Sequence, residues 1–253
     1  MSLFSEYMTG SITTLTEREL VNVSAITANA FYCGTDGSTT CPLTSISFPS
    51  SVKTINAYAF CNSTLQNVNS DSLDPYCFIR MHAFDGTPFV NNITAGSMLY
   101  MSNGRILVSH KISKPSTNLS IPDTVVNIAS RALYKYSEDT NFKKCVIPDT
   151  VEILGDNIFD EQSTLTSITV GASVRRIGVD LTPSNSVTTL IFRQPAGMYV
   201  ELPPAGDGEF IGLAYNKNSR NVSIYTDNEC IKNYDWATDN VTATFYPLSS
   251  APA

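Results

Sequence analysis

The chain repeats one phrase, and this repetition constrains the fold more than any other feature of the sequence. A proline opens each full copy, a valine follows three residues later, and further apolar residues close the phrase. Full copies lie at residues 49–60, 122–133 and 148–159, with a shorter version at residues 171–178. A unit of this size cannot bury its own apolar face. Such units must therefore stack on their neighbours.

A short apolar strand is predicted before several copies. Its apolar residues fall at the first, fourth and sixth positions, and the last two share one face of a strand. These residues are Leu43, Ile46 and Phe48; Phe142, Cys145 and Ile147; Leu165, Ile168 and Val170; Val187, Leu190 and Phe192. The residue between the last two faces away and is Ser47, Val146, Thr169 or Ile191. A proline follows at Pro49, Pro122, Pro148 and Pro195 and ends the strand, because it cannot donate to the ladder. The next segment fits either a half-turn of helix or a second short strand.

The spacing of the copies points to a known class of repeat. Equivalent valines and phenylalanines recur at intervals of 23 to 29 residues, within the range of about 20–29 residues of leucine-rich repeats. In phrase and spacing, roughly residues 20–247 resemble BspA-like leucine-rich repeats of bacteria, protists and phages. Residues 98–109 resemble a hairpin inserted in this family, with Asn103-Gly104 as its turn signal. Residues 224–236 resemble the family's C-terminal cap.

We therefore predict a leucine-rich-repeat solenoid of about seven turns, with mostly short parallel β-strands, short helical or 3-10 turns and one inserted hairpin. A single domain spans residues 1–253. Its parts are an N-terminal cap (1–20), repeats (21–90), the hairpin insert (90–117), repeats (118–195), a loop (196–221) and a C-terminal cap (222–253). Two inward columns are expected: Val52, Val125, Val151 and Val174, then Ile55, Ile128, Ile153 and Ile177.

Composition and charge narrow the choice of partners. Hydrophobic residues make up 42% of the 253-residue chain, enough for a continuous core. The net charge of -7, with no cluster of Lys or Arg, argues against a nucleic-acid partner. No stretch approaches the about 20 apolar residues of a membrane span, so no membrane insertion is expected.

The opening residues lack the positive segment and apolar run of a secretory signal. The expected location is nevertheless a virion or the cell surface, because a phage protein leaves the cell by lysis. Apolar residues within residues 1–10, at Leu3, Phe4, Tyr7 and Met8, predict a short helix. This helix either caps the first repeat or docks the chain in a larger assembly.

The chain carries six cysteines but no zinc-site spacing. Cys145 falls at a buried strand position, where a thiol acts as a small hydrophobe. Two alternatives remain open for the others. They are buried or free thiols, or Cys33 and Cys41 bridge the loop between them.

The sequence marks no catalytic centre. His82 and His110 are the two histidines, and neither lies in a metal-binding motif. No nucleophile elbow, phosphate-binding loop or calcium loop is present. Asp156, Asp160 and Glu161 lie close in sequence but fall at a repeat turn that is expected to face solvent. We expect no enzyme, no cofactor and no metal, and a hydrolase is the least favoured alternative.

Two surfaces are candidates for binding. The first is the outward row of the strands, where hydroxyl and amide side chains suit contact with protein or glycan: Thr44, Ser47, Gln66, Asn69, Ser120 and Thr169. The second is the loop at 196–221, with Tyr199 and Phe210, although these residues could equally cover the end of the core. The predicted function is a non-catalytic binding module for adhesion or assembly, on a phage particle or cell surface. The alternative is a purely structural virion protein, either capsid-decorating or tail-associated.

Overall fold

The structure is a computed structural model, and it describes residues 12–34, 41–111, 118–134, 142–182, 186–205, 212–214 and 219–252. The chain divides into two compact units, residues 1–111 and 112–253. Each unit is described by itself, so the single domain stays a prediction. The proposed N-terminal helix at residues 1–10 lies outside the described residues.

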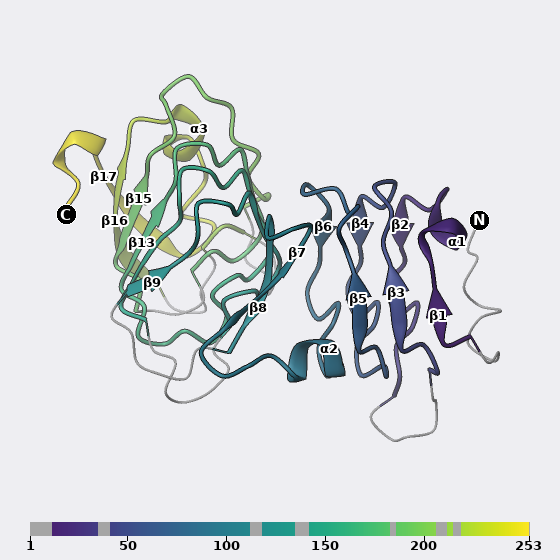
Figure 1. The fold of residues 1–253 in the computed structure, drawn as a ribbon. Helices are drawn as coiled ribbons and strands as arrows, with labels where there is room; N and C mark the ends of the chain where they lie inside the picture. Colours follow the sequence, from purple (N-terminus) through teal and green to yellow (C-terminus); the bar gives the residue numbers. More distant parts are fainter. Residues whose placement is uncertain are drawn as a thin grey trace. The chain divides into compact units, whose positions relative to one another are not determined.

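The first unit consists of stacked turns that each carry two short strands (Figure 1). β1, β3 and β5 form one parallel sheet, and β2, β4 and β6 form another. The antiparallel hairpin of β7 and β8 follows them. The elements are β1 (Thr14–Leu15), α1 (Glu17–Leu20), β2 (Ala25–Ile26), β3 (Ser45–Ser47), β4 (Thr54–Ile55), β5 (Asn67–Asn69), β6 (Phe78–Ile79), α2 (Pro88–Asn91), β7 (Met98–Met101) and β8 (Ile106–His110).

The second unit repeats the arrangement. β9, β11, β13, β15, β16 and β17 form a six-stranded parallel sheet in that order, and β10, β12 and β14 pair in parallel beside it. The elements are β9 (Asn118–Ser120), β10 (Asn127–Ile128), β11 (Lys144–Val146), β12 (Ile153–Leu154), β13 (Ser167–Val170), β14 (Arg176–Ile177), β15 (Thr189–Phe192), β16 (Arg220–Thr226), α3 (Glu229–Lys232), β17 (Val241–Tyr246) and the 3-10 turn η2 (Leu248–Ser250).

The solenoid prediction is confirmed, with about eight turns in place of seven. In the described residues, three turns of each unit carry both strands. β15 with Glu201, which bridges in parallel to Arg176, makes a seventh turn. The eighth runs from β16 through α3 to β17. After Pro49, Pro122 and Pro148 the chain forms a second short strand, which settles the choice that the sequence left open.

The predicted inward positions are confirmed, with one error of register. All twelve apolar strand residues of the sequence pattern are buried. Val125, Val151 and Val174 are fully buried, as is Val52 in the first unit. Ile128, however, aligns with Leu154 and not with Ile153, and Leu154 aligns with Ile177. The predicted Ile153 column was therefore wrong by one residue. The residue that enters this second column lies three positions after the buried valine, and after Val151 that residue is Leu154.

A ladder of phenylalanine rings runs through the first unit. The Phe31 and Phe60 rings stack with centroids 5.1 Å apart, and the Phe60 and Phe84 rings stack at 5.2 Å. Phe48 meets the Phe60 ring edge-on at 6.0 Å. Phe31, Phe60 and Phe84 come from successive turns, so the ladder follows directly from the repeat.

Each of the six described turns that carry two strands also contains a residue in the left-handed region of φ. In the second unit these residues are Arg131, Asn157 and Asp180, and in the first unit Tyr58 and His82 share the conformation, all with φ between 52° and 59°. Such values are uncommon for side chains larger than glycine. The turn therefore tolerates side chains there, and no glycine marks it in the sequence.

The predicted hairpin is confirmed. β7 pairs antiparallel with β8, and Met101 lies opposite Ile106. Ser102, Asn103 and Gly104 in the connecting turn all have positive φ. The Ser102 hydroxyl donates to the Leu73 carbonyl oxygen at 2.6 Å, which ties the hairpin to the repeats of the first unit.

The six cysteines are thiols in this structure, and five of them are buried. Cys33 Sγ accepts a hydrogen bond from the Cys41 backbone N–H at 2.9 Å. Burial raises the pKa of the Cys145 thiol to about 12, so this side chain packs as an apolar group. The position of Cys145 inside the sheet agrees with the prediction.

The last turn closes the second unit around a buried polar cluster. The Asp239 carboxylate accepts hydrogen bonds from the Leu213 N–H at 2.8 Å, the Ala214 N–H at 2.9 Å and the Tyr234 hydroxyl at 3.0 Å. The neighbouring Arg220 guanidinium donates to the Ala214 carbonyl oxygen at 2.9 Å. The Trp236 indole packs edge-on against Phe192 with centroids 6.5 Å apart. These contacts make residues 212–214 and 219–241 a cap on the core.

Asp180 lies near this cluster and accepts a hydrogen bond from the Asn157 amide at 3.0 Å. Burial, reinforced by the negative charge of Asp160, raises the pKa of the Asp180 carboxyl to about 7. The ordinary value in an unfolded chain is about 3.9. The folded state therefore binds this proton more tightly, and the corresponding stability is lost as pH rises from about 4 to 7.

We predict that Phe60→Ala lowers the free energy of unfolding by about 3–5 kcal/mol, because it removes the middle ring of the ladder and leaves a cavity. Gln66→Ala, at an exposed position of the same unit, should change it by less than about 0.5 kcal/mol. Urea unfolding followed by circular dichroism measures both. Equal losses would show that the assignment of inside and outside is wrong.

We also predict that Asp180→Asn stabilises the chain at pH 8 relative to the unsubstituted chain, and does so less at pH 4.5. Asparagine keeps the acceptor oxygen and tolerates positive φ, but it carries no charge to bury. Thermal melting at both pH values measures the difference. The exposed Asp123→Asn variant serves as the control. If its stability changed with pH as that of Asp180→Asn does, the raised pKa of the Asp180 carboxyl would not be the cause.

Candidate binding face

The outward side of the six-stranded sheet presents one in-register row of side chains, which we call the outer row. Alternate residues of a strand point to opposite faces, so parallel strands in register align their outward residues across the sheet. From β9 to β17 the outer row is Ser120, Val146, Thr169, Ile191, Tyr225 and Tyr246. The second outward row on the same face is mostly hydroxylic and contains Lys144, Ser167, Thr189, Ser223 and Thr244.

The outer row changes from polar to apolar along the sheet. Ser120 is exposed, and the Val146 side chain on the next strand is 46% exposed. At the other end, the Tyr225 and Tyr246 rings stack with centroids 5.0 Å apart. The sequence predicted hydroxyl groups along this face and also placed Val146 and Ile191 outward. With the two tyrosines, the outer row forms an apolar stripe bordered by hydroxyl groups.

Thr169 is the predicted site residue whose exposure the structure contradicts. It is only 8% exposed, and its neighbour Ile191 in the outer row is 7% exposed. Both line a hollow of about 260 Å³ that Pro252 also lines. The chain returns across this face after β17, so a position that points outward from the sheet is covered. Local alternation of side chains could not reveal this cover.

The predicted residues of the first unit do lie at its surface. Thr44, Gln66 and Asn69 are exposed, and Ser47 is half-buried. Ser47 and Asn69 are direct neighbours across β3 and β5. The Thr44 hydroxyl donates to the Thr13 carbonyl oxygen at 3.1 Å, and Asn69 Oδ1 accepts from the Asp71 N–H at 3.0 Å. Fixed hydroxyl and amide groups of this kind can bind a polar partner without reordering. Their role in binding stays a prediction.

A broader hollow of about 540 Å³ adjoins the covered region in the second unit, and Val146 lines both. Ser120, Asp123 and Arg193 are among its other lining residues. An Arg193 Nη1 lies 3.4 Å from Asp149 Oδ1, so the two opposite charges border the hollow as a pair. The hollow thus combines an aliphatic floor with a balanced polar rim.

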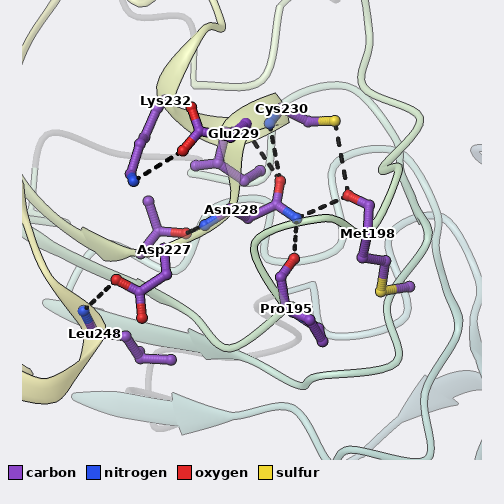
Figure 2. A network of polar contacts seen from close by, with 10 residues as sticks. Pro195, Met198, Asp227, Asn228, Glu229, Cys230, Lys232 and Leu248 are labelled. Atoms are coloured by element: carbon purple, nitrogen blue, oxygen red, sulfur yellow. Dashed lines mark hydrogen bonds and ion pairs between the residues drawn. The ribbon is translucent and has the colours of Figure 1, made fainter.

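The second predicted surface is the loop that carries Tyr199, and Asn228, which the sequence analysis did not single out, fixes its turn. The Asn228 amide nitrogen donates to the Pro195 and Met198 carbonyl oxygens at 2.7 and 2.8 Å, while its oxygen accepts from the Cys230 N–H at 3.0 Å (Figure 2). The turn that it holds presents Tyr199, whose side chain is 76% exposed. An Asn before a short helix is a capping signal, but its second partner lies 30 residues away in sequence. Phe210, the other predicted residue, lies outside the described residues.

The two histidines lie in different surroundings. His82 Nδ1 lies 2.6 Å from Asp85 Oδ2, and the ring stacks on Tyr58 with centroids 4.7 Å apart. His110 is buried. Across the described ranges, no group of three or more His, Cys, Asp or Glu residues could hold a metal ion. No helix in that part of the chain has the length and apolar character needed to cross a membrane. The absence of catalysis stays a prediction.

Three solved structures of leucine-rich-repeat and surface proteins show similarity to this chain. A leucine rich cell surface protein from Faecalibacterium prausnitzii is 15% identical, with a TM-score of 0.39 over 95% of this chain and 60% of that protein. The pneumococcal vaccine antigen PcpA is 12% identical, with a TM-score of 0.33 over 93% of this chain and 89% of that one. A leucine-rich repeat protein from Bacteroides ovatus is 18% identical, with a TM-score of 0.26 over 90% and 57%. The chain thus spans less than two thirds of the first and third proteins.

No curated protein matches the chain. The family comparison is more informative. Six copies of the BspA type leucine rich repeat region match residues 24–104 and 79–195, which together cover more than half of the sequence. These are the residues that form the stacked turns described above. The chain therefore belongs to the BspA-type leucine-rich-repeat family.

Proposed function

We propose that this chain is a non-catalytic binding module that contacts protein or glycan through the outward faces of its parallel sheets. The observation that carries the proposal is the in-register display of side chains on a rigid sheet. In the first unit, Ser47 and Asn69 lie side by side, and Gln66 and Asn69 are exposed. Such rows place several donors and acceptors at a fixed spacing, which favours a repetitive or extended partner.

The net charge of -7 also bears on the partner. The exposed groups named above in the first unit are uncharged, so recognition would rest on hydrogen bonds and shape more than on long-range attraction. Neutral protein surfaces and uncharged glycans fit this chemistry. We place the module on a cell surface or a virion, in keeping with an adhesive or assembly role.

A purely structural role in a virion is the second candidate, and β17 favours it. β17 is the last strand of its sheet, and its Phe245 and Tyr246 side chains are each 40% exposed. An exposed edge with apolar side chains can pair with another chain. A subunit of this kind would assemble with other virion proteins, and its loss would change the mass of the particle without affecting host attachment.

The test of the binding module adds negative charge to the outward face of the first unit's strands. We predict that the double variant Gln66→Glu with Asn69→Glu lowers retention on the bound surface at least tenfold, because each new carboxylate must be desolvated against the partner. Retention of labelled protein is measured on a glycan array, on host cells and on purified virions.

Asn91→Glu with Asn92→Glu is the matched control. It adds the same two charges to exposed positions at the end of α2, outside the strands of either sheet. The control should retain binding. If both double variants are folded and are retained equally, the proposal is contradicted. It is also contradicted if the unsubstituted chain binds to none of the three surfaces.

A further inference from the structure

The chain covers part of its own binding face. After β17, residues 247–252 turn back, and Pro252 lines the hollow above Thr169 and Ile191. Those two side chains are 8% and 7% exposed, whereas Val146, in the same outer row, is 46% exposed. All three point outward from the sheet. The contrast marks where the segment lies and where the row is open.

The covering segment has a simple chemistry. Its sequence is Pro-Leu-Ser-Ser-Ala-Pro, with no charged side chain. Pro247 has φ -64° and ψ 146°, and Ala251 has φ -62° and ψ 140°. Both are extended, polyproline-like values, and the single turn η2 lies between them. The segment whose Pro252 lines the hollow is therefore short and uncharged, with aliphatic, hydroxyl and prolyl side chains.

The segment is lightly held. The Leu248 N–H donates to Asp227 Oδ1 at 3.3 Å (Figure 2). Hydrogen bonds from Ser250 N–H to the Pro247 oxygen and from Ala251 N–H to the Leu248 oxygen, both 3.0 Å, lie within the segment. Leu248 and Ala251 are half-buried, and its other residues are exposed. A segment with little buried surface opens at low free-energy cost.

We propose that the outer row at β13 and β15 is a site for an extended, uncharged, proline-containing peptide, and that residues 247–252 are its built-in, displaceable occupant. The apolar floor of Val146 and Ile191 accepts aliphatic side chains, and the bordering Ser and Thr hydroxyls can bond to an exposed peptide backbone. The open hollow beside Val146 extends the site beyond the covered part. This inference rests on the proposed function, since it names a ligand class and a control for the same outward face.

A truncated chain tests the proposal directly. The variant lacking residues 247–253 should bind a fluorescein-labelled peptide with the sequence of residues 246–252, as measured by fluorescence anisotropy. The full chain should bind the peptide at least tenfold more weakly, because a tethered segment competes at an effective concentration in the millimolar range. A peptide with aspartate in place of its leucine should not bind either chain. Circular dichroism establishes that the truncated chain is folded.

Two substitutions test the covering segment and the apolar floor separately. Leu248→Asp in the full chain should loosen the segment and increase peptide binding without shortening the chain. Ile191→Thr in the truncated chain should weaken binding, because it removes the apolar floor at a position that points away from the core. A folded truncated chain that binds no peptide would overturn the inference, as would equal binding by the full and truncated chains. Neither result depends on retention by cells, virions or glycans, so the proposed function would stand or fall separately.

Discussion

The close, in-register stacking of successive turns is the constraint on which the rest of the structure depends. Parallel strands lie about 4.8 Å apart, so each position of the repeat sits directly over its equivalent. The phenylalanine rings of the first unit, 5.1 and 5.2 Å apart, show the same spacing in side chains. In the second unit the backbone itself approaches closely. A Cβ added at Gly155 would lie 2.3 Å from the Ser130 nitrogen, and one at Gly171 would lie 2.2 Å from the Pro148 oxygen. Larger residues at these two positions would force the turns apart.

This stacking turns the outward face into a set of rows whose chemistry can change from turn to turn without any change in the fold. Only inward positions are constrained to be apolar. The outer row of the second unit runs from Ser120 through Val146 and Ile191 to the stacked Tyr225 and Tyr246. The first unit keeps Ser47 and Asn69 in the same relation to their strands. One architecture therefore carries a polar face and an apolar stripe, and the difference arises from substitutions that cost the core nothing.

The turn that carries α3 is held to the array by different interactions. Trp236 packs on Phe192, and Asp239 binds two backbone N–H groups and the Tyr234 hydroxyl. At the surface, Asn228 joins the start of α3 to the turn at Pro195 and Met198 through two hydrogen bonds. Most of these contacts connect residues 25 or more positions apart, and they replace the ladder of the repeats. The segment after β17 then crosses the sheet face, so closing the core and covering the face are achieved by consecutive parts of the chain.

The sequence by itself determined the solenoid, the family, the hairpin at Asn103-Gly104 and the buried strand positions, because each depends on a short pattern that recurs at a regular interval. The spacing of three residues after Val151 also indicates Leu154 as the inward residue, although we predicted Ile153 for that position. It could not show that Thr169 is covered, that Asn228 holds the Tyr199 turn, or that Asp180 is buried enough to raise the pKa of its carboxyl. Those properties depend on segments that are distant along the chain and meet only after the turns have stacked. Local periodicity records which side of a strand a residue takes, and only the tertiary structure decides what lies on that side.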